Sequence, residues 1–140
     1  MKRIADAQWQ GDLQAGSGSV ALGSGAFKGP YSYRSRFEDG SGTNPEELLG
    51  AAHAACFSMA LALGLAKAGH PATQVNTRAT VNFGPSTDGF AISRIELQTE
   101  GKVPGIDAAT FQKFATEAKL QCPVSKALAS VEITLTAKLA

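Results

Sequence analysis

Two cysteines, Cys56 and Cys122, are the residues of this 140-residue chain whose side chains could most readily do chemistry. In a reducing compartment, two thiols more often serve chemistry than form a structural cross-link. They are far apart in the sequence, so only the fold can bring them together as a thiol pair. The alternative is that both are small, buried and inert core residues, as free cysteines often are.

The expected surroundings of the two thiols differ. Pro123 is a natural first residue for a short helix over residues 123–128, which makes Cys122 the N-cap, where free N–H groups favour a thiolate. Cys56 lies among alanines in a long apolar segment, where burial raises the pKa of a thiol unless a cation is near. Arg34 and Arg36 are the candidate cations, although a solvated strand face also explains arginines there.

Glu46 and His53 are seven residues apart and share nearly one helix face, and His53 precedes Cys56 by one turn. A Cys–His pair fits a nucleophile with its base, or part of a metal site. The other possible ligands, His70 and Cys122, are single and distant in sequence. We therefore expect no metal, and a packing role for His53. The glycine-rich motifs of nucleotide-binding sites are also missing, so no cofactor is expected.

A long helix over residues 43–68 must position Cys56. Asn44 is its predicted N-cap, Pro45 is its first residue, Glu47 takes the capping-box place, and Gly69 ends it. Small residues occur nearly all round this helix, which predicts close approach by other backbone and burial on more than one side. A single short chain offers few elements for such cover, so the pattern favours a homodimer.

The rest of the chain predicts strands and one further helix. Residues 31–37 and 131–139 alternate apolar and polar residues, as half-buried strands do. Residues 75–83 and 90–100 read as partner strands, with a bulge near residues 93–94 where the apolar pattern changes phase. The remaining predicted features are a strand near residues 4–9, turns at 16–19 and 28–30, strand-like chain from 20, and a helix over 108–119 capped by Asp107. The layout is α+β, a single domain over residues 1–140 with mostly antiparallel pairing.

The charge and composition of the chain exclude several classes of partner. The net charge is +1 and the 13 basic residues are scattered, which provides no surface for nucleic acid or for an anionic membrane. Residues 48–66 are long enough to span a bilayer, but they are mostly alanine and glycine, so we expect a core helix. The first ten residues lack the apolar stretch of a secretory signal, which predicts a cytoplasmic protein.

Three segments resemble the OsmC/Ohr family of thiol peroxidases. They are TNPEELLGAAHAACFSMA at residues 43–60, VPGID at 103–107 and CPVS at 122–125. The similarity runs from the Trp9 region to the last predicted strand, and the GAAHAAC form of residues 50–56 is closer to the OsmC branch than to Ohr. The resemblance implies an intertwined homodimer around the long central helix, with active sites at the interface.

The resemblance also implies an activity in defence against oxidative stress, the reduction of organic hydroperoxides and, more weakly, hydrogen peroxide, without metal, haem or other cofactor. Cys56 matches the peroxidatic cysteine, which becomes a sulfenic acid, and Cys122 matches the resolving cysteine, which closes a disulfide. Arg36 matches the family's active-site arginine, the cation that Cys56 needs, and Glu46 matches the glutamate that orients it.

Other functions stay open at this point. The implied reductants are small dithiols, notably lipoyl groups in the Ohr branch. A non-catalytic thiol redox sensor or binding module on the same fold would use the same cysteines, and a metal-binding structural protein is a third class. The first of these alternatives predicts one oxidation without turnover.

Overall fold

A computed structural model of the chain describes residues 1–140. Its contacts gather into a first unit, residues 1–48, and a second unit, residues 49–140. The fold is α+β, as the sequence predicts, with one three-stranded sheet in each unit.

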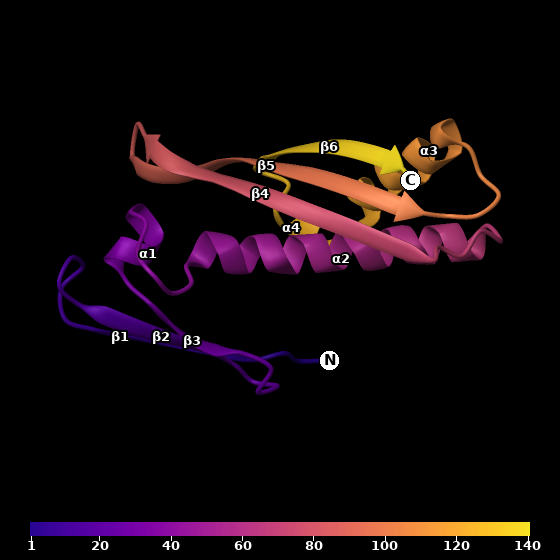
Figure 1. The fold of residues 1–140 in the computed structure, drawn as a ribbon. Coiled ribbons are helices and arrows are strands. Elements are labelled where there is room, and N and C mark those ends of the chain that lie inside the picture. Colours follow the sequence, from indigo (N-terminus) through magenta and orange to yellow (C-terminus); the bar gives the residue numbers. More distant parts are fainter. The chain divides into compact units, whose positions relative to one another are not determined.

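The first unit is built on an antiparallel meander in the order β1-β2-β3 (Figure 1). Its elements are β1 (Ala5–Gln10), β2 (Ser17–Leu22), β3 (Lys28–Tyr31) and the short helix α1 (Tyr33–Phe37). The strand near residues 4–9 and the strand-like chain from residue 20 were predicted, but the turns expected at 16–19 and 28–30 are wrong, because those residues lie largely in β2 and β3. Glycine is needed at Gly18, where a Cβ would collide with the paired Tyr31 ring. Pro30 is tolerated because β3 is an edge strand.

The strand predicted over residues 31–37 is wrong beyond its first residue, because α1 forms there. Ser32 begins this helix with a capping box: its hydroxyl accepts from the Ser35 N–H at 3.1 Å, and its own N–H donates to Ser35 Oγ at 2.8 Å. Tyr33 and Phe37, one turn apart, stack with ring centroids 4.7 Å apart. The apolar and polar pattern of these five residues is too short to distinguish a strand from a helix, and the Ser32 cap favours the helix.

The second unit contains a mixed sheet in the order β4-β5-β6, with β4 antiparallel to β5 and β6 parallel to it (Figure 1). Its elements are α2 (Pro45–Lys67, whose first residues belong to the first unit), β4 (Gln74–Ser86), β5 (Gly89–Lys102), α3 (Ala108–Gln121), α4 (Pro123–Ala127) and β6 (Glu132–Leu139). In β5, Ser93 has no partner between the pairs Asn82–Arg94 and Phe83–Ile92. The bulge predicted from the change of apolar phase is therefore confirmed.

The ends of α2 explain why it spans this stretch. Asn44 Oδ1 accepts from the Glu47 N–H at 2.8 Å, as expected of the N-cap. The Glu47 carboxylate accepts from the Thr43 hydroxyl at 2.9 Å. At the other end Gly69 has a φ of +84°, and the N–H of His70 reaches back to Leu65 O at 2.9 Å. This is a Schellman motif, so the predicted glycine stop is confirmed.

One face of α2 lies in the core of the second unit. Phe57, Leu61 and Leu65 are fully buried there, among residues of β5 and α3 that include Ile95, Leu97, Phe111 and Ala115. Burial of each large side chain stabilises the fold by about 1.5–3 kcal/mol. The opposite face is uncovered in the single chain: Met59 is 75% exposed and Leu63 56%. The expectation of a helix buried on more than one side is thus met on one side only.

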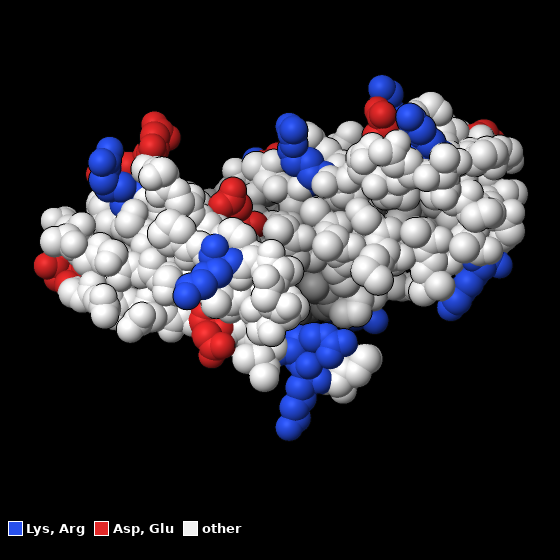
Figure 2. Space-filling view, turned by 60° about the horizontal axis from the view of Figure 1, so that its bottom comes forward, with Lys and Arg blue, Asp and Glu red and all other residues white.

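Helix α2 also meets the length and composition of a membrane span, with a mean hydropathy of 1.8 over its most apolar window. A core helix of a water-soluble protein satisfies the same criterion, and the buried face of α2 is of that kind. Charged side chains of both signs are scattered singly and in small groups with uncharged surface between them, as Figure 2 shows for one face. This agrees with the scattered basic residues of the sequence.

Candidate active site

The second unit brings the two cysteines together. Cys56 lies in the middle of α2 and Cys122 lies between α3 and α4, and both are free thiols. Cys122 is fully buried, whereas Cys56 is partly exposed. Their side chains interact directly, and each shifts the pKa of the other. Two thiols that face one another can exchange a proton and can be joined by oxidation.

Cys122 is held by its place in the backbone. Its N–H donates to Ala118 O at 2.9 Å and closes α3, and its Sγ accepts from the Ser125 N–H at 3.5 Å and opens α4. Pro123 stands at the first position of α4, as predicted. Because proline has no N–H, the amides of Val124 and Ser125 are the next donors available to sulfur. The predicted N-cap position of Cys122 is confirmed.

The environment of Cys56 favours its thiol form. Burial raises the pKa of Cys56, and the neighbouring Cys122 raises it further. The backbone N–H of Val124 opposes these effects without overcoming them. The sequence predicts this direction for a thiol in an alanine-rich helix. Cys56 therefore needs a further positive charge before it is an effective nucleophile at neutral pH.

Cys122 shows the reverse shift. Burial opposes its ionisation most strongly, but a hydrogen bond from the Cys56 thiol and others from Ser125 and Val124 outweigh this and lower the pKa of Cys122. Within the second unit a thiolate is therefore favoured on Cys122, with Cys56 as the proton donor beside it.

A buried histidine, His53, contacts Ser125, the residue whose N–H donates to Cys122. His53 Nε2 lies 2.7 Å from Ser125 Oγ, and its Nδ1 has no hydrogen-bond partner. Burial lowers the pKa of His53, so the ring is neutral at pH 7. A hydrogen-bonded packing histidine was predicted. Sequence reasoning assigned no role to Ser125, and the signal that could have found it is its position three residues after the N-cap Cys122.

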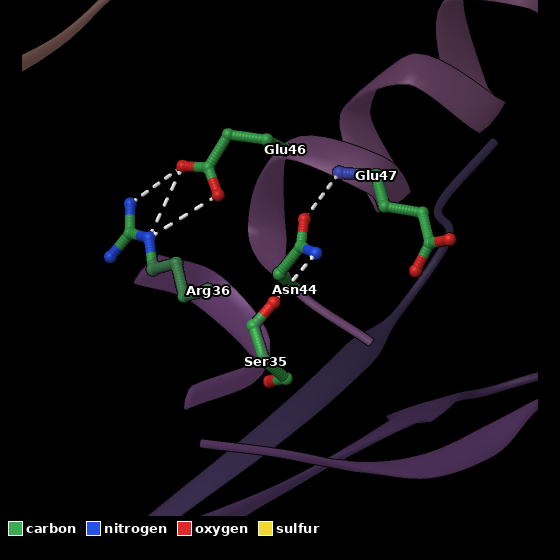
Figure 3. A network of polar contacts seen from close by, with 5 residues as sticks. All are labelled: Ser35, Arg36, Asn44, Glu46 and Glu47. Carbon is green, nitrogen blue, oxygen red and sulfur yellow. Dashed lines mark hydrogen bonds and ion pairs between the residues drawn. The ribbon is translucent and has the colours of Figure 1, made fainter. Parts of the chain in front are cut away.

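In the first unit Arg36 and Glu46 form an ion pair (Figure 3). Arg36 Nη2 lies 2.7 Å from Glu46 Oε1, and Arg36 Nε lies 3.2 and 3.3 Å from the two carboxylate oxygens. Glu46 is buried at 7% exposure, while the Arg36 side chain is 35% exposed. The guanidinium also lies 5.5 Å from the centre of the Phe37 ring. The structure thus brings together two of the four predicted site residues.

Short polar contacts tie α1 to the start of α2. Asn44 Nδ2 donates to Ser35 O at 3.1 Å, and Ser35 Oγ donates to Thr43 O at 2.7 Å (Figure 3 shows the first of these). The same asparagine caps α2 through its oxygen. Because both helices are fixed at this junction, Arg36 on α1 and Glu46 on α2 are held in register for their ion pair.

Comparison with known proteins identifies the family of this chain. The profile of the family described as OsmC-like protein matches residues 38–136. The chain belongs to the OsmC-like family. The peroxiredoxin OsmC of Escherichia coli strain K12 is 52% identical over 130 residues, which cover 92% of this chain and 90% of that protein. An organic hydroperoxide resistance protein of Xanthomonas axonopodis pv. citri is 38% identical over 100 residues, covering 69% of this chain and 68% of that protein.

A solved structure shows the same fold. The crystal structure of the organic hydroperoxide resistance protein OhrB of Bacillus subtilis matches with a TM-score of 0.73 over 98% of both chains, at 22% identity. The greater identity to an OsmC protein than to the Xanthomonas protein agrees with the predicted place in the OsmC branch. The four predicted site residues of this OsmC-like chain fall into two pairs, Arg36–Glu46 and Cys56–Cys122, one in each unit.

Proposed function

We propose that this OsmC-like protein is a cytoplasmic cysteine-based peroxidase, an oxidoreductase that reduces organic hydroperoxides to alcohols and, more weakly, hydrogen peroxide to water. The observation that carries the proposal is the pairing of Cys56 with Cys122, two free thiols far apart in sequence that interact directly. The names of the relatives, a peroxiredoxin and an organic hydroperoxide resistance protein, support the same chemistry.

The proposed cycle has two chemical steps before reduction. The Cys56 thiolate attacks the distal peroxide oxygen, the O–O bond breaks, and the alkoxide leaves and takes up a proton, so that Cys56 becomes a sulfenic acid. The Cys122 thiolate then attacks the Cys56 sulfur, and the disulfide forms as hydroxide leaves to become water. The partial exposure of Cys56 and the full burial of Cys122 suit these roles, because only the first thiol must meet substrate.

Arg36 and Glu46 carry the proposed roles of cation and orienting carboxylate. The raised pKa of Cys56 supports a role for a nearby positive charge, and the family resemblance implies that Arg36 provides it. Glu46 holds the guanidinium through both carboxylate oxygens, which limits the directions it can take. These roles come from family membership together with the ion pair.

The proposed partners are a hydroperoxide, a dithiol reductant of the lipoyl type and a second copy of the chain. The homodimer is supported by the uncovered apolar face of α2, where Met59 and Leu63 are exposed beside the exposed alanines Ala52 and Ala55. A large apolar helix face of this kind is normally covered by another surface in solution. We propose no metal, no cofactor, and no nucleic-acid or membrane partner.

The deciding experiment is a steady-state peroxidase assay with lipoamide or dithiothreitol against several hydroperoxides. We expect turnover by the wild type and none by Cys56→Ser, and stoichiometric cumene hydroperoxide should remove about two mass units per chain as the disulfide forms. Normal peroxide consumption by Cys56→Ser contradicts the mechanism. One oxidation without turnover with any dithiol instead identifies a redox sensor, and metal found by elemental analysis of the purified protein supports the structural alternative.

A further inference from the structure

His53 of α2, Ser125 of α4 and Cys122 form a series of contacts, called the donor line below. His53 Nε2 lies 2.7 Å from Ser125 Oγ, and the N–H of Ser125 donates to Cys122 Sγ at 3.5 Å, so the hydroxyl of Ser125 belongs to the residue that already contacts the sulfur. His53 and Cys122 are fully buried and Ser125 is 6% exposed. In such a dry site each proton position matters, because water cannot replace a missing donor.

The protons in this line can be placed by counting donors. The neutral imidazole of His53 carries one N–H, on either Nδ1 or Nε2. A proton on Nδ1 would leave a buried N–H without an acceptor and would make Ser125 donate to the ring, away from sulfur. A proton on Nε2 lets His53 donate to Ser125 Oγ, so the single hydroxyl proton of Ser125 is free to point at Cys122. The second arrangement leaves no buried N–H unpaired and makes one more proton available to the buried sulfur.

We propose that His53 and Ser125 are positioning residues for Cys122: His53 Nε2–H donates to Ser125 Oγ, and Ser125 Oγ–H donates to Cys122 Sγ and holds it as a thiolate. The inference rests on the proposed peroxidase cycle, in which Cys122 is the attacking sulfur. His53 and Ser125 touch neither substrate nor the peroxide oxygen in this scheme, and they act through Cys122 alone.

The donor line also determines how the disulfide is opened. A thiolate of the dithiol attacks Cys56, the more exposed sulfur, the S–S bond breaks, and its electron pair goes to Cys122. The leaving thiolate is received by the same hydroxyl and amide donors of Ser125. The second thiol of the reductant then displaces Cys56 and leaves as a cyclic disulfide. Cys122 is therefore the leaving group in one half of the cycle and the nucleophile in the other.

Other charges and titratable groups near this line are few. Cys56 on α2 interacts with Cys122 directly. Lys119 of α3 and Lys126 of α4 line a hollow of about 270 Å³ that reaches Ser125. Apolar residues that follow α4 in sequence, such as Val131 and Ile133, line it as well. Lys119 Nζ donates to Ile133 O at 3.3 Å. Both lysines stay unchanged in the variants of the test.

The test uses Ser125→Ala, which removes the hydroxyl and keeps the amide, and His53→Leu, which removes the donor to it. His53→Gln is the rescue variant, since its amide nitrogen can replace Nε2–H. Ser58→Ala is the matched control: Ser58 lies on α2 two residues after Cys56, and its hydroxyl donates to Thr77 Oγ1 at 2.8 Å. Two readouts are taken, the ultraviolet titration of the Cys122 thiolate in a Cys56→Ser background, and the rate of disulfide closure by quenched-flow mass spectrometry with both cysteines present.

We expect Ser125→Ala and His53→Leu to raise the pKa of Cys122 by about one unit or more, since a hydrogen bond to a charge is worth that shift. Below the pKa, closure should slow by about threefold per unit, because the thiolate fraction falls tenfold while intrinsic nucleophilicity partly compensates. His53→Gln should restore both values, and Ser58→Ala should leave both as in the wild type.

An unchanged pKa in Ser125→Ala overturns the proposal, whether or not His53→Leu folds. Equal shifts in His53→Gln and His53→Leu show that His53 acts by packing and not as a donor, and an equal shift in Ser58→Ala assigns the effect to general loosening. The titration needs no peroxide. A normal titration result without any peroxide consumption therefore rejects the proposed function while the donor line stands.

Discussion

The carboxylate of Glu46, at the start of α2, accepts from both Nε and Nη2 of Arg36 on α1. The two residues lie ten positions apart, and the loop between them closes on itself through Ser35 and Asn44. A carboxylate that is buried while its partner is partly exposed limits the movement of the guanidinium.

Glu46→Gln should lower the free energy of unfolding by about 1–2 kcal/mol, because a buried charge-assisted contact becomes a neutral one while the exposure of Arg36 reduces the loss. The measurement is urea denaturation followed by circular dichroism. Glu38→Gln is the matched control, since Glu38 pairs with Arg34 on the same helix α1 but both are exposed, and its effect should stay within about 0.5 kcal/mol. Equal losses in the two variants contradict a special role for the Arg36–Glu46 pair.

Arg36→Met should move the pH dependence of the first oxidation step to higher pH by about one unit or more. Burial already raises the pKa of Cys56, so the rate should rise with pH as its thiolate forms. Removal of the cation should raise the pKa of Cys56 further and move this rise in rate to higher pH. Stopped-flow oxidation by cumene hydroperoxide in a Cys122→Ser background measures the profile. Arg36→Lys should lie between the wild type and Arg36→Met, and a superimposable profile for Arg36→Met excludes the assigned role.

Cys122→Ser should lose sustained turnover: it should consume one equivalent of hydroperoxide per chain when peroxide is limiting and a second equivalent when peroxide is in excess. Without the second thiol the Cys56 sulfenic acid persists and is oxidised further to the sulfinic acid when peroxide is in excess. Intact-protein mass spectrometry should show the addition of one and then two oxygen atoms on Cys56. Sustained turnover at the wild-type rate with dithiothreitol would mean that Cys122 is not the resolving thiol.

Stability should fall on mild acidification because of His53. Burial lowers the pKa of His53 below its ordinary value of about 6.5, so the unfolded state binds the proton first. The stabilisation is therefore present above about pH 6.5 and is lost as pH falls below it. Denaturant midpoints at pH 7 and just above pH 5 should differ, and the difference should shrink in His53→Gln. Staying above pH 5 avoids Glu96 and Asp107, whose lowered pKa values act at more acidic pH.

Met59→Lys should weaken self-association while leaving the fold of the single chain stable, because Met59 is 75% exposed there and a lysine meets no steric obstacle. Size-exclusion chromatography with light scattering at micromolar protein should give a dimer mass for the wild type and a lower mass for the variant. Leu120→Lys on α3, where Leu120 is 64% exposed, is the control and should remain dimeric. A monomer mass for the wild type contradicts the proposed homodimer.

Local signals predicted much of this fold. The cap Asn44, the stop Gly69 and the phase change at Ser93 each depend on residues near in sequence, and each is found as expected. The error at α1 has the same origin, because the apolar and polar pattern of a five-residue stretch is too short to distinguish a strand from a helix. The deciding Ser32–Ser35 capping box is a local feature that sequence reasoning overlooked.

Contacts between distant residues were less predictable. The direct approach of Cys56 to Cys122 was expected only through the family resemblance, since no spacing rule joins them. The contact between His53 and Ser125 joins residues 72 positions apart, and the sequence around either residue does not predict the other as its partner. Such pairs depend on how α2 packs against the α3–α4 junction, which is a property of the whole core.

Cys122 closes α3 with its amide and opens α4 with its sulfur, so the same residue belongs to the backbone of both helices. A covalent bond at that sulfur removes the charge that the Ser125 N–H would meet in the thiolate form. The strength of the hydrogen bond that begins α4 therefore depends on the oxidation state of Cys122. Hydrogen exchange at the Ser125 amide should quicken when the disulfide forms and slow again when it is reduced.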